Sequence, residues 1–170
     1  MESDSIPRIQ VTVEAGAWAI RLSRLEQLCE AAVAAALAAE EPPQRGPAEV
    51  SVLLTDDSHI RELNRIWRGQ DKATNVLSFP ALDDELPPLP EGEPVLLGDV
   101  VLAFETVERE ALQEDKPFAD HVAHLLVHGV LHLLGHDHED PAEAVAMERQ
   151  EAVILAGLGV PDPYRGELAA

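Results

Sequence analysis

The sequence predicts a single α/β (α+β) domain, in which a mixed sheet of about four strands is covered by about five helices. Its 170 residues are enough for one hydrophobic core and too few for two. Apolar residues make up 46% of the chain and aromatic residues only 4%, a globular composition whose core must be largely aliphatic. Strand patterns dominate the first part of the chain and helical patterns the last, which favours a sheet covered by helices.

Four segments of the chain show the sequence patterns of β-strands. Residues 8–14 and residues 48–54 alternate apolar and polar side chains, as half-buried strands do. Residues 75–79 are a short run rich in β-forming residues that stops at Pro80. Residues 97–103 are mostly apolar and are expected to form a buried strand.

Helical spacing of apolar residues marks the remaining elements. The first expected helix spans residues 23–40 and is stopped by a pair of prolines. A second begins at a cap provided by Asp56 or Asp57 and ends at Gly69. The apolar face of this second helix is expected to carry Ile60, Leu63, Asn64 and Trp67. Further helices are expected at residues 104–114, 118–134 and 141–157.

Residues 81–96 separate the last two expected strands and contain four prolines and five acidic residues. Because this acidic, proline-rich segment has few apolar side chains to bury, we expect a mobile surface loop that proteases cut first. The chain contains neither an internal repeat nor a linker, so residues 1–170 are expected to form one domain.

The charge of the chain bears on the kind of partner it can bind. Acidic residues number 32 and basic residues 12, giving a net charge of −20, which by itself argues against a nucleic-acid partner. A local group of bases lies within residues 61–72, namely Arg61, Arg65, Arg68 and Lys72. A cationic patch can therefore form on an acidic body, whose charge otherwise keeps the protein soluble.

From the sequence we expect a cytoplasmic protein by default. Its N-terminus is acidic and lacks the basic start and apolar centre of a secretory signal. No apolar stretch approaches the ~20 residues that span a bilayer, so no membrane partner is expected. Cys29 is the only cysteine, which rules out an internal disulfide and fits a reducing compartment.

Histidines are concentrated in the last third of the chain. Six of the seven lie within residues 121–138, a density that core packing or solvation would not produce by chance. His128 and His132 are four positions apart, so a helix places both on one face, where two imidazole nitrogens can hold one ion. Gly135 allows the chain to turn back directly after this helix and to bring His138 to the same ion.

These three histidines predict one divalent transition metal, expected to be Zn²⁺, in each chain. Three protein ligands leave a fourth position for water, which is the arrangement of catalytic zinc, and the expected chemistry is hydrolysis at the metal. Other arrangements remain open. The metal could use His124 with His128, His136 could replace His138, or the histidines could form a packed or solvated cluster without metal.

Gly129 lies within the expected metal-binding helix, where glycine costs about 1 kcal/mol relative to alanine. A bare backbone there suits the close approach of a substrate or a neighbouring strand, or tight helix packing. Metalloproteases with the H-E-x-x-H motif carry their general base directly after the first histidine. Since glycine occupies that position here, a peptidase mechanism would need Asp137 or Glu139 as its base.

The segment HGVLHLLGHDH, residues 128–138, resembles the motif H-G-x-L-H-L-x-G-[YF]-D-H of the YbeY family of bacterial endoribonucleases, also called rRNA maturation factors. The single departure is His136, which replaces the usual aromatic residue. Similarity to three further family blocks follows in the expected order at residues 63–80, 97–103 and 146–155. The resemblance thus covers most of residues 50–160.

This resemblance implies a function and assigns roles to residues. It implies an endoribonuclease directed at single strands that acts in ribosomal RNA processing, especially at the 3′ end of small-subunit RNA, and in ribosome quality control. It also implies zinc held by His128, His132 and His138, and a functional arginine at Arg68. The implied partners are single-stranded or ribosomal RNA, with ribosomal proteins or ribosome-associated GTPases as further candidates.

Phosphodiester cleavage suits such a site because it builds negative charge on the phosphoryl oxygens, which a metal ion and Arg68 would stabilise together. Either water or the substrate 2′-OH can be the nucleophile. For Arg68 the alternative is a surface arginine in an ion pair. Two alternative functions also remain open: a metalloprotease or other metal-dependent hydrolase, and a non-catalytic, zinc-stabilised module that binds ribosomal or protein partners.

Overall fold

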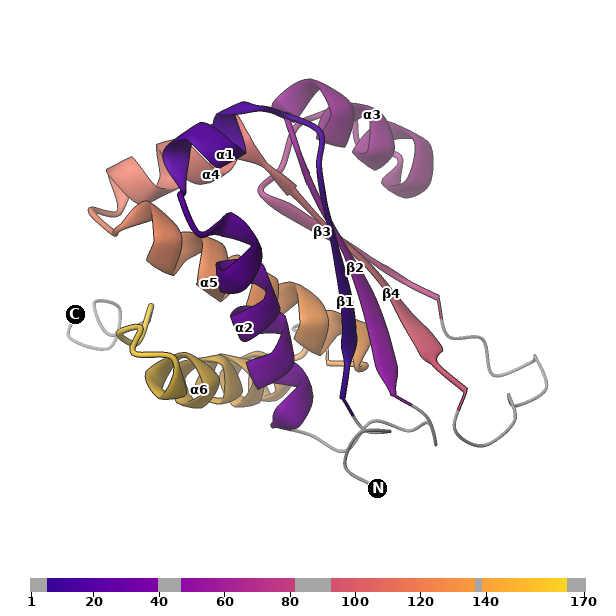
Figure 1. The fold of residues 1–170 in the computed structure, drawn as a ribbon, viewed down its shortest axis with the longest axis vertical. Helices are drawn as coiled ribbons and strands as arrows, with labels where there is room; N and C mark the ends of the chain where they lie inside the picture. Colours follow the sequence, from indigo (N-terminus) through magenta and orange to yellow (C-terminus); the bar gives the residue numbers. More distant parts are fainter. Residues whose placement is uncertain (1–5, 40–46, 82–92, 137–138, 165–170) are drawn as a thin grey trace.

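The computed structural model describes residues 6–39, 47–81, 93–136 and 139–164. In this part of the chain, one four-stranded mixed sheet is accompanied by six helices, which confirms the predicted α/β class (Figure 1). The strands are β1 (Arg8–Val13), β2 (Ala48–Thr55), β3 (Val76–Pro80) and β4 (Val95–Ala103). The helices are α1 (Ala17–Arg21), α2 (Leu25–Ala38), α3 (Asp57–Arg68), α4 (Phe104–Gln113), α5 (Phe118–Leu133) and α6 (Pro141–Gly157).

The strands lie in the order β1-β2-β4-β3, which the sequence pattern alone did not predict. β1, β2 and β4 are parallel, whereas β3 pairs antiparallel with β4 at one edge of the sheet. Because β3 is an edge strand, its side chains can contribute to a cleft beside the sheet. The long helix α5 packs against β3 and β4, so the predicted histidine helix lies at this edge.

The two faces of the sheet are covered unequally. Val100 and Leu102 of β4 belong to the main core, where α2 and α5 pack on one face of the sheet and α6 packs against these two helices. The alternate residues Val101 and Ala103 join Ile60 of α3 in a small second cluster, which places α3 on the opposite face (Figure 1). No helix in the described segments is long and apolar enough to cross a membrane.

Helix α3 begins and ends as its sequence predicts. The Asp56 side chain accepts a hydrogen bond from the backbone N–H of His59 at 2.8 Å, and Gly69 ends the helix with a left-handed φ of 69°. Of the predicted apolar face, Ile60 and Asn64 are buried, but Trp67 is 68% exposed. Placing Trp67 on the packed face was therefore wrong, because the cluster beneath α3 does not extend to the last turn of the helix.

Helix α1 is an element that the sequence pattern did not predict, and it raises the number of helices above the expected five. Its five residues are too few to show helical periodicity. The helix is held by Trp18, which is fully buried and donates its indole N–H to the Thr55 carbonyl at 2.8 Å. The Trp18 ring also packs against Phe104 and Phe118, so an aromatic cluster supplements the aliphatic core.

The acidic, proline-rich segment predicted at residues 81–96 falls largely on residues 82–92, which lie outside the described part of the chain. Its predicted C-terminal end was wrong, because β4 already begins at Val95. Val95 and Leu96 pair with Ala48 and Glu49 of β2. Pairing with a distant strand thus overrides the local composition of these residues.

Gly129 lies where α5 makes its closest approach to the sheet. A Cβ atom at this position would be 2.6 Å from Cγ1 of Val100 and 3.1 Å from Oγ of Ser78. The Ser78 hydroxyl also donates a hydrogen bond to the Gly129 carbonyl at 2.9 Å. Of the explanations offered for a bare backbone, the close approach of neighbouring strands is therefore the one that the structure shows.

We expect Gly129→Ala to lower the free energy of unfolding by about 1–2 kcal/mol, as measured by urea denaturation, because overpacking outweighs the better helix propensity of alanine. The Val100 side chain is buried and β-branched, so it cannot turn away easily. Gly157→Ala in α6 is the matched control, since a Cβ atom there would have no neighbour within 4 Å. Equal stability of the two variants would contradict this account.

Candidate active site

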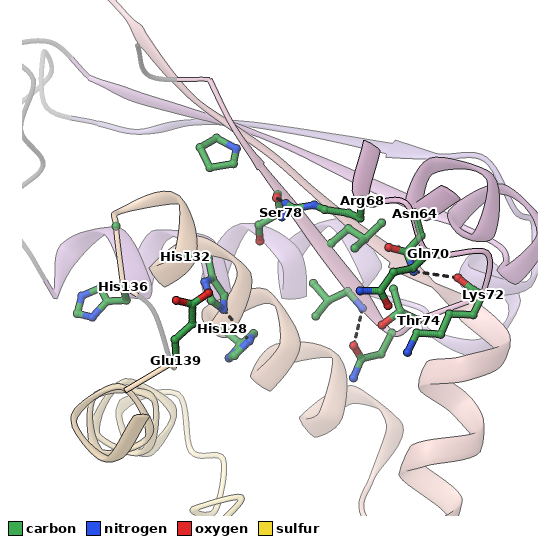
Figure 2. A pocket seen from close by; sticks show the side chains of 15 residues that line it. Asn64, Arg68, Gln70, Lys72, Thr74, Ser78, His128, His132, His136 and Glu139 are labelled. Carbon is green, nitrogen blue, oxygen red and sulfur yellow. Dashed lines mark hydrogen bonds between the residues drawn. The ribbon is translucent and has the colours of Figure 1, made fainter. Parts of the chain in front are cut away.

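The histidine pair predicted to bind metal lies on the C-terminal half of α5. His128 and His132 are one helical turn apart, and their Nε2 atoms face each other at 3.1 Å (Figure 2). Two Zn–N bonds of about 2.0–2.1 Å at a tetrahedral angle would hold their nitrogens roughly 3.4 Å apart. The pair therefore fits one metal ion with little movement of either ring.

The chain reverses direction directly after this pair, as the sequence predicts. Gly135 adopts a left-handed φ of 102°, and the backbone N–H of His136 donates to the Leu131 carbonyl at 3.0 Å. His138 lies outside the described residues, so its place in the site stays a prediction. Among the described residues, no three His, Cys, Asp or Glu side chains form a metal-binding group.

His124, the alternative partner of His128, is engaged elsewhere. Its Nε2 atom lies 2.7 Å from Oε1 of Glu151 and 3.1 Å from the hydroxyl of Tyr164. The ring centroids of His124 and His128 are also 6.4 Å apart, whereas those of His128 and His132 are 4.6 Å apart. These contacts favour His128 and His132, and not His124 and His128, as the metal-binding pair.

Glu151 of α6 is a residue of the site that the sequence analysis missed. Its side chain is only 1% exposed, and its carboxylate contacts His124, His128 and Tyr164. Burial by itself raises the pKa of this carboxyl group. Hydrogen bonds and charge interactions with the two histidines outweigh that effect and lower the pKa to about 2. The group is therefore ionised at neutral pH.

The sequence contains a pattern that could have identified Glu151. This residue lies four positions from both Met147 and Leu155, which are buried on the same face of α6. An acidic residue in the middle of such an apolar stripe is unusual, because a buried carboxylate needs partners.

Arg68 lies on the opposite side of the site, in the last turn of α3. Its Nη2 atom donates a hydrogen bond to the Ser78 carbonyl of β3, and its guanidinium carbon lies 5.4 Å from the centroid of the Phe79 ring. These contacts direct the side chain from the helix toward the edge strand, as Figure 2 shows. Among the residues that the structure describes, Arg68 forms no ion pair, which was the alternative for this side chain.

A cleft of about 670 Å³ joins the two sides. Its walls come from the end of α3, the following turn, β3, and the end of α5 with the turn after it (Figure 2). The structure thus brings Arg68 together with His128 and His132, which are about 60 residues away in sequence. His136 and Glu139 also line this cleft, whereas Asp137 lies outside the described residues.

The four bases of residues 61–72 divide into two groups. Arg61 is paired with Asp71, with Nε 2.7 Å from a carboxylate oxygen, and Arg65 is paired with Glu62. Arg68 and Lys72 instead line the cleft. The cationic patch predicted on the acidic body is therefore smaller than four charges, but its two remaining members line the same cleft as the histidine pair.

Comparison with known proteins identifies the family. The chain matches the family described as Endoribonuclease YbeY over residues 10–159. The chain belongs to the YbeY family of endoribonucleases. A relative named Endoribonuclease YbeY from Paramagnetospirillum magneticum is 51% identical over 156 residues, covering 92% of this chain and 94% of the relative. One from Azorhizobium caulinodans is 55% identical over 162 residues, covering 92% and 95%.

A solved structure supports the fold assignment within the YbeY family. The solution structure of a protein from Thermotoga maritima superimposes with a TM-score of 0.56 and 25% sequence identity, covering 95% of this chain and 91% of that one. The family match spans both walls of the cleft and the predicted third ligand, His138. The resemblance first noted in the histidine motif is therefore confirmed over most of the chain.

Proposed function

We propose that this protein is a zinc-dependent endoribonuclease that cleaves single-stranded RNA in the cleft between α3, β3 and α5. Its proposed roles are the maturation of the 3′ end of small-subunit ribosomal RNA and ribosome quality control in the cytoplasm. The observation that carries the proposal is the placement of Arg68 opposite the converging pair His128 and His132, in a member of the YbeY family.

The residues of the cleft would divide the work of phosphodiester cleavage. His128 and His132, with His138 as the proposed third ligand, would hold zinc, which polarises a phosphate oxygen or lowers the pKa of a bound water toward ~7. Arg68 would donate hydrogen bonds to the other phosphoryl oxygens as negative charge builds on them. The contact with Ser78 uses one of the five N–H groups of this guanidinium, so it can keep its orientation while it binds phosphate.

Lys72 is the second cation of the cleft, and we propose that it binds the RNA backbone next to the cleaved bond. It follows Arg68 by four residues, beyond the turn at Gly69, and lines the same cleft. Because the chain carries a net charge of −20, each cation facing the substrate has a large effect on RNA binding. Ribosomal proteins or ribosome-associated GTPases would supply further basic surface for delivering the RNA.

We expect Lys72→Ala to weaken binding of single-stranded RNA several-fold, and to reduce the slope of log K against log salt concentration by about 0.7, the value for one phosphate contact. Fluorescence anisotropy of a labelled oligonucleotide over a range of salt concentrations measures both. Arg61→Ala is the matched control, because its guanidinium is already neutralised by Asp71. An equal loss in the two variants would show that only the overall charge matters.

One set of assays separates the proposed function from its alternatives. Zinc-loaded protein is incubated with labelled single-stranded RNA, with the corresponding duplex and, separately, with casein. The proposal expects internal cleavage of the single strand, little cleavage of the duplex, and intact casein. Cleavage of casein would favour a metalloprotease, with Glu139 as the candidate base in the cleft. Tight RNA binding without cleavage would favour the non-catalytic module.

A further inference from the structure

A charge network centred on the buried Glu151 lies next to the histidine pair, between α5 and α6. Glu151 of α6 directs one carboxylate oxygen, Oε1, to Nε2 of His124 at 2.7 Å and accepts a hydrogen bond from the hydroxyl of Tyr164 at 2.9 Å. Its other oxygen, Oε2, lies 3.4 Å from Nδ1 of His128. Glu151 thus connects one metal-binding candidate to two further side chains.

The direction of these hydrogen bonds follows from the geometry around the Glu151 carboxylate, whose two oxygens face the Tyr164 hydroxyl and two histidine ring nitrogens. A carboxylate can only accept, so Nδ1 of His128 must carry the hydrogen in this contact. A neutral imidazole with its hydrogen on Nδ1 has its lone pair on Nε2, the atom that faces His132 at 3.1 Å. The tautomer favoured by Glu151 is therefore the one that a metal ion between the two rings requires.

We propose that Glu151 is a positioning residue, which holds His128 in the tautomer and ring orientation that present its Nε2 lone pair to zinc. This inference rests on the proposed function, because it concerns the zinc site of the same cleft. His124 and Tyr164 have a supporting role: they bind Oε1 and so fix the carboxylate with Oε2 directed at His128.

The energetics of burial support a specific role for this carboxylate. Glu151 is 1% exposed and lies between the core residues Met147 and Leu155 on α6, where an apolar side chain would pack without cost. Two of its three partners, His124 and Tyr164, would be enough to satisfy one oxygen. Within the described part of the chain, the second oxygen contacts the metal-binding candidate His128, which is the arrangement by which carboxylates orient zinc-binding histidines in general.

The test compares the zinc affinity of two variants by competition with a chelator. Glu151→Gln keeps the size of the side chain but removes its charge, and we expect a 10–100-fold loss of zinc affinity. Glu110→Gln is the matched control, because Glu110 forms the same kind of contact with a histidine of α5, His121, at 2.9 Å, but away from the pair. Its zinc affinity should stay within about twofold of that of the unmodified protein.

Nitrogen-15 NMR of the histidine rings in the metal-free protein supplies a readout that a merely structural role would not change. We expect His128 to carry its hydrogen on Nδ1 in the unmodified protein and to become a mixture of tautomers in Glu151→Gln. A folded Glu151→Gln variant with unchanged zinc affinity and an unchanged His128 tautomer would overturn the proposal.

Two further outcomes are distinguishable. If Glu151→Gln does not fold, Tyr164→Phe decides the question, because it removes one hydrogen bond that anchors the carboxylate and should lower zinc affinity several-fold; no change in this variant would overturn the proposal. If the unmodified protein itself binds no zinc, the zinc part of the proposed function fails. The NMR measurement then still tells whether Glu151 sets the tautomer of His128.

Discussion

Replacing His128 or His132 with alanine is expected to reduce the zinc content of the purified protein from about one ion per chain to nearly none. Each of these residues supplies one of the two nitrogens that converge at 3.1 Å, and a site with only two ligands left binds zinc weakly. His138→Ala should have the same effect, since it removes the proposed third ligand. Metal analysis by mass spectrometry measures the result, together with the thermal stability of each variant.

His121→Ala is the control for this prediction, because His121 lies on the same helix but is bound to Glu110. It should retain its zinc. Full zinc occupancy in His138→Ala would mean that the third ligand is another residue, and His136, which lines the cleft, would be tested next. Full occupancy in His128→Ala would contradict the metal site as proposed.

Features set by local sequence were predicted well. The cap at Asp56, the end of α3 at Gly69 and the start of α6 at Pro141 depend on residues within one turn, so their chemistry is visible in the sequence. The convergence of His128 and His132 is of the same kind, because a spacing of four residues places two side chains on one face of any helix.

Features set by contacts between distant elements were not predictable in this way. The exposure of Trp67 depends on where the cluster beneath α3 ends, and the role of Glu151 depends on how α6 packs against α5. Helical periodicity identifies both residues as members of a face but does not say what that face meets. The antiparallel position of β3 beside β4 belongs here too, and it is what gives the cleft its second wall.

Arg68 falls between these two cases. Its place near the end of a helix was predicted from Gly69, and its role was implied by the family resemblance. Its direction, however, is set by the Ser78 carbonyl, ten residues away on a strand whose position the sequence did not reveal. The partner in the structure is thus a backbone oxygen, and this matters for what a substitution would do.

We expect Arg68→Ala to fold and bind zinc normally but to cleave single-stranded RNA on the order of 10²–10³-fold more slowly. The side chain is exposed, and the hydrogen bond it makes to Ser78 holds the arginine in place more than it holds the fold. Its loss should therefore affect the stabilisation of charge on the phosphate and leave the histidine pair intact. Single-turnover cleavage, zinc content and thermal stability are measured on the same samples.

Two further variants make this prediction specific to the guanidinium of Arg68. Arg68→Lys should recover only part of the activity, because an ammonium group cannot bind the Ser78 carbonyl and a phosphate with the geometry of a planar fork. Arg65→Ala, one turn earlier on α3, removes an arginine that is paired with Glu62 and should leave cleavage nearly unchanged. Cleavage by Arg68→Ala within a few-fold of the unmodified protein would exclude this residue from the mechanism. Loss of zinc or of stability would instead show that Arg68 supports the structure of the cleft.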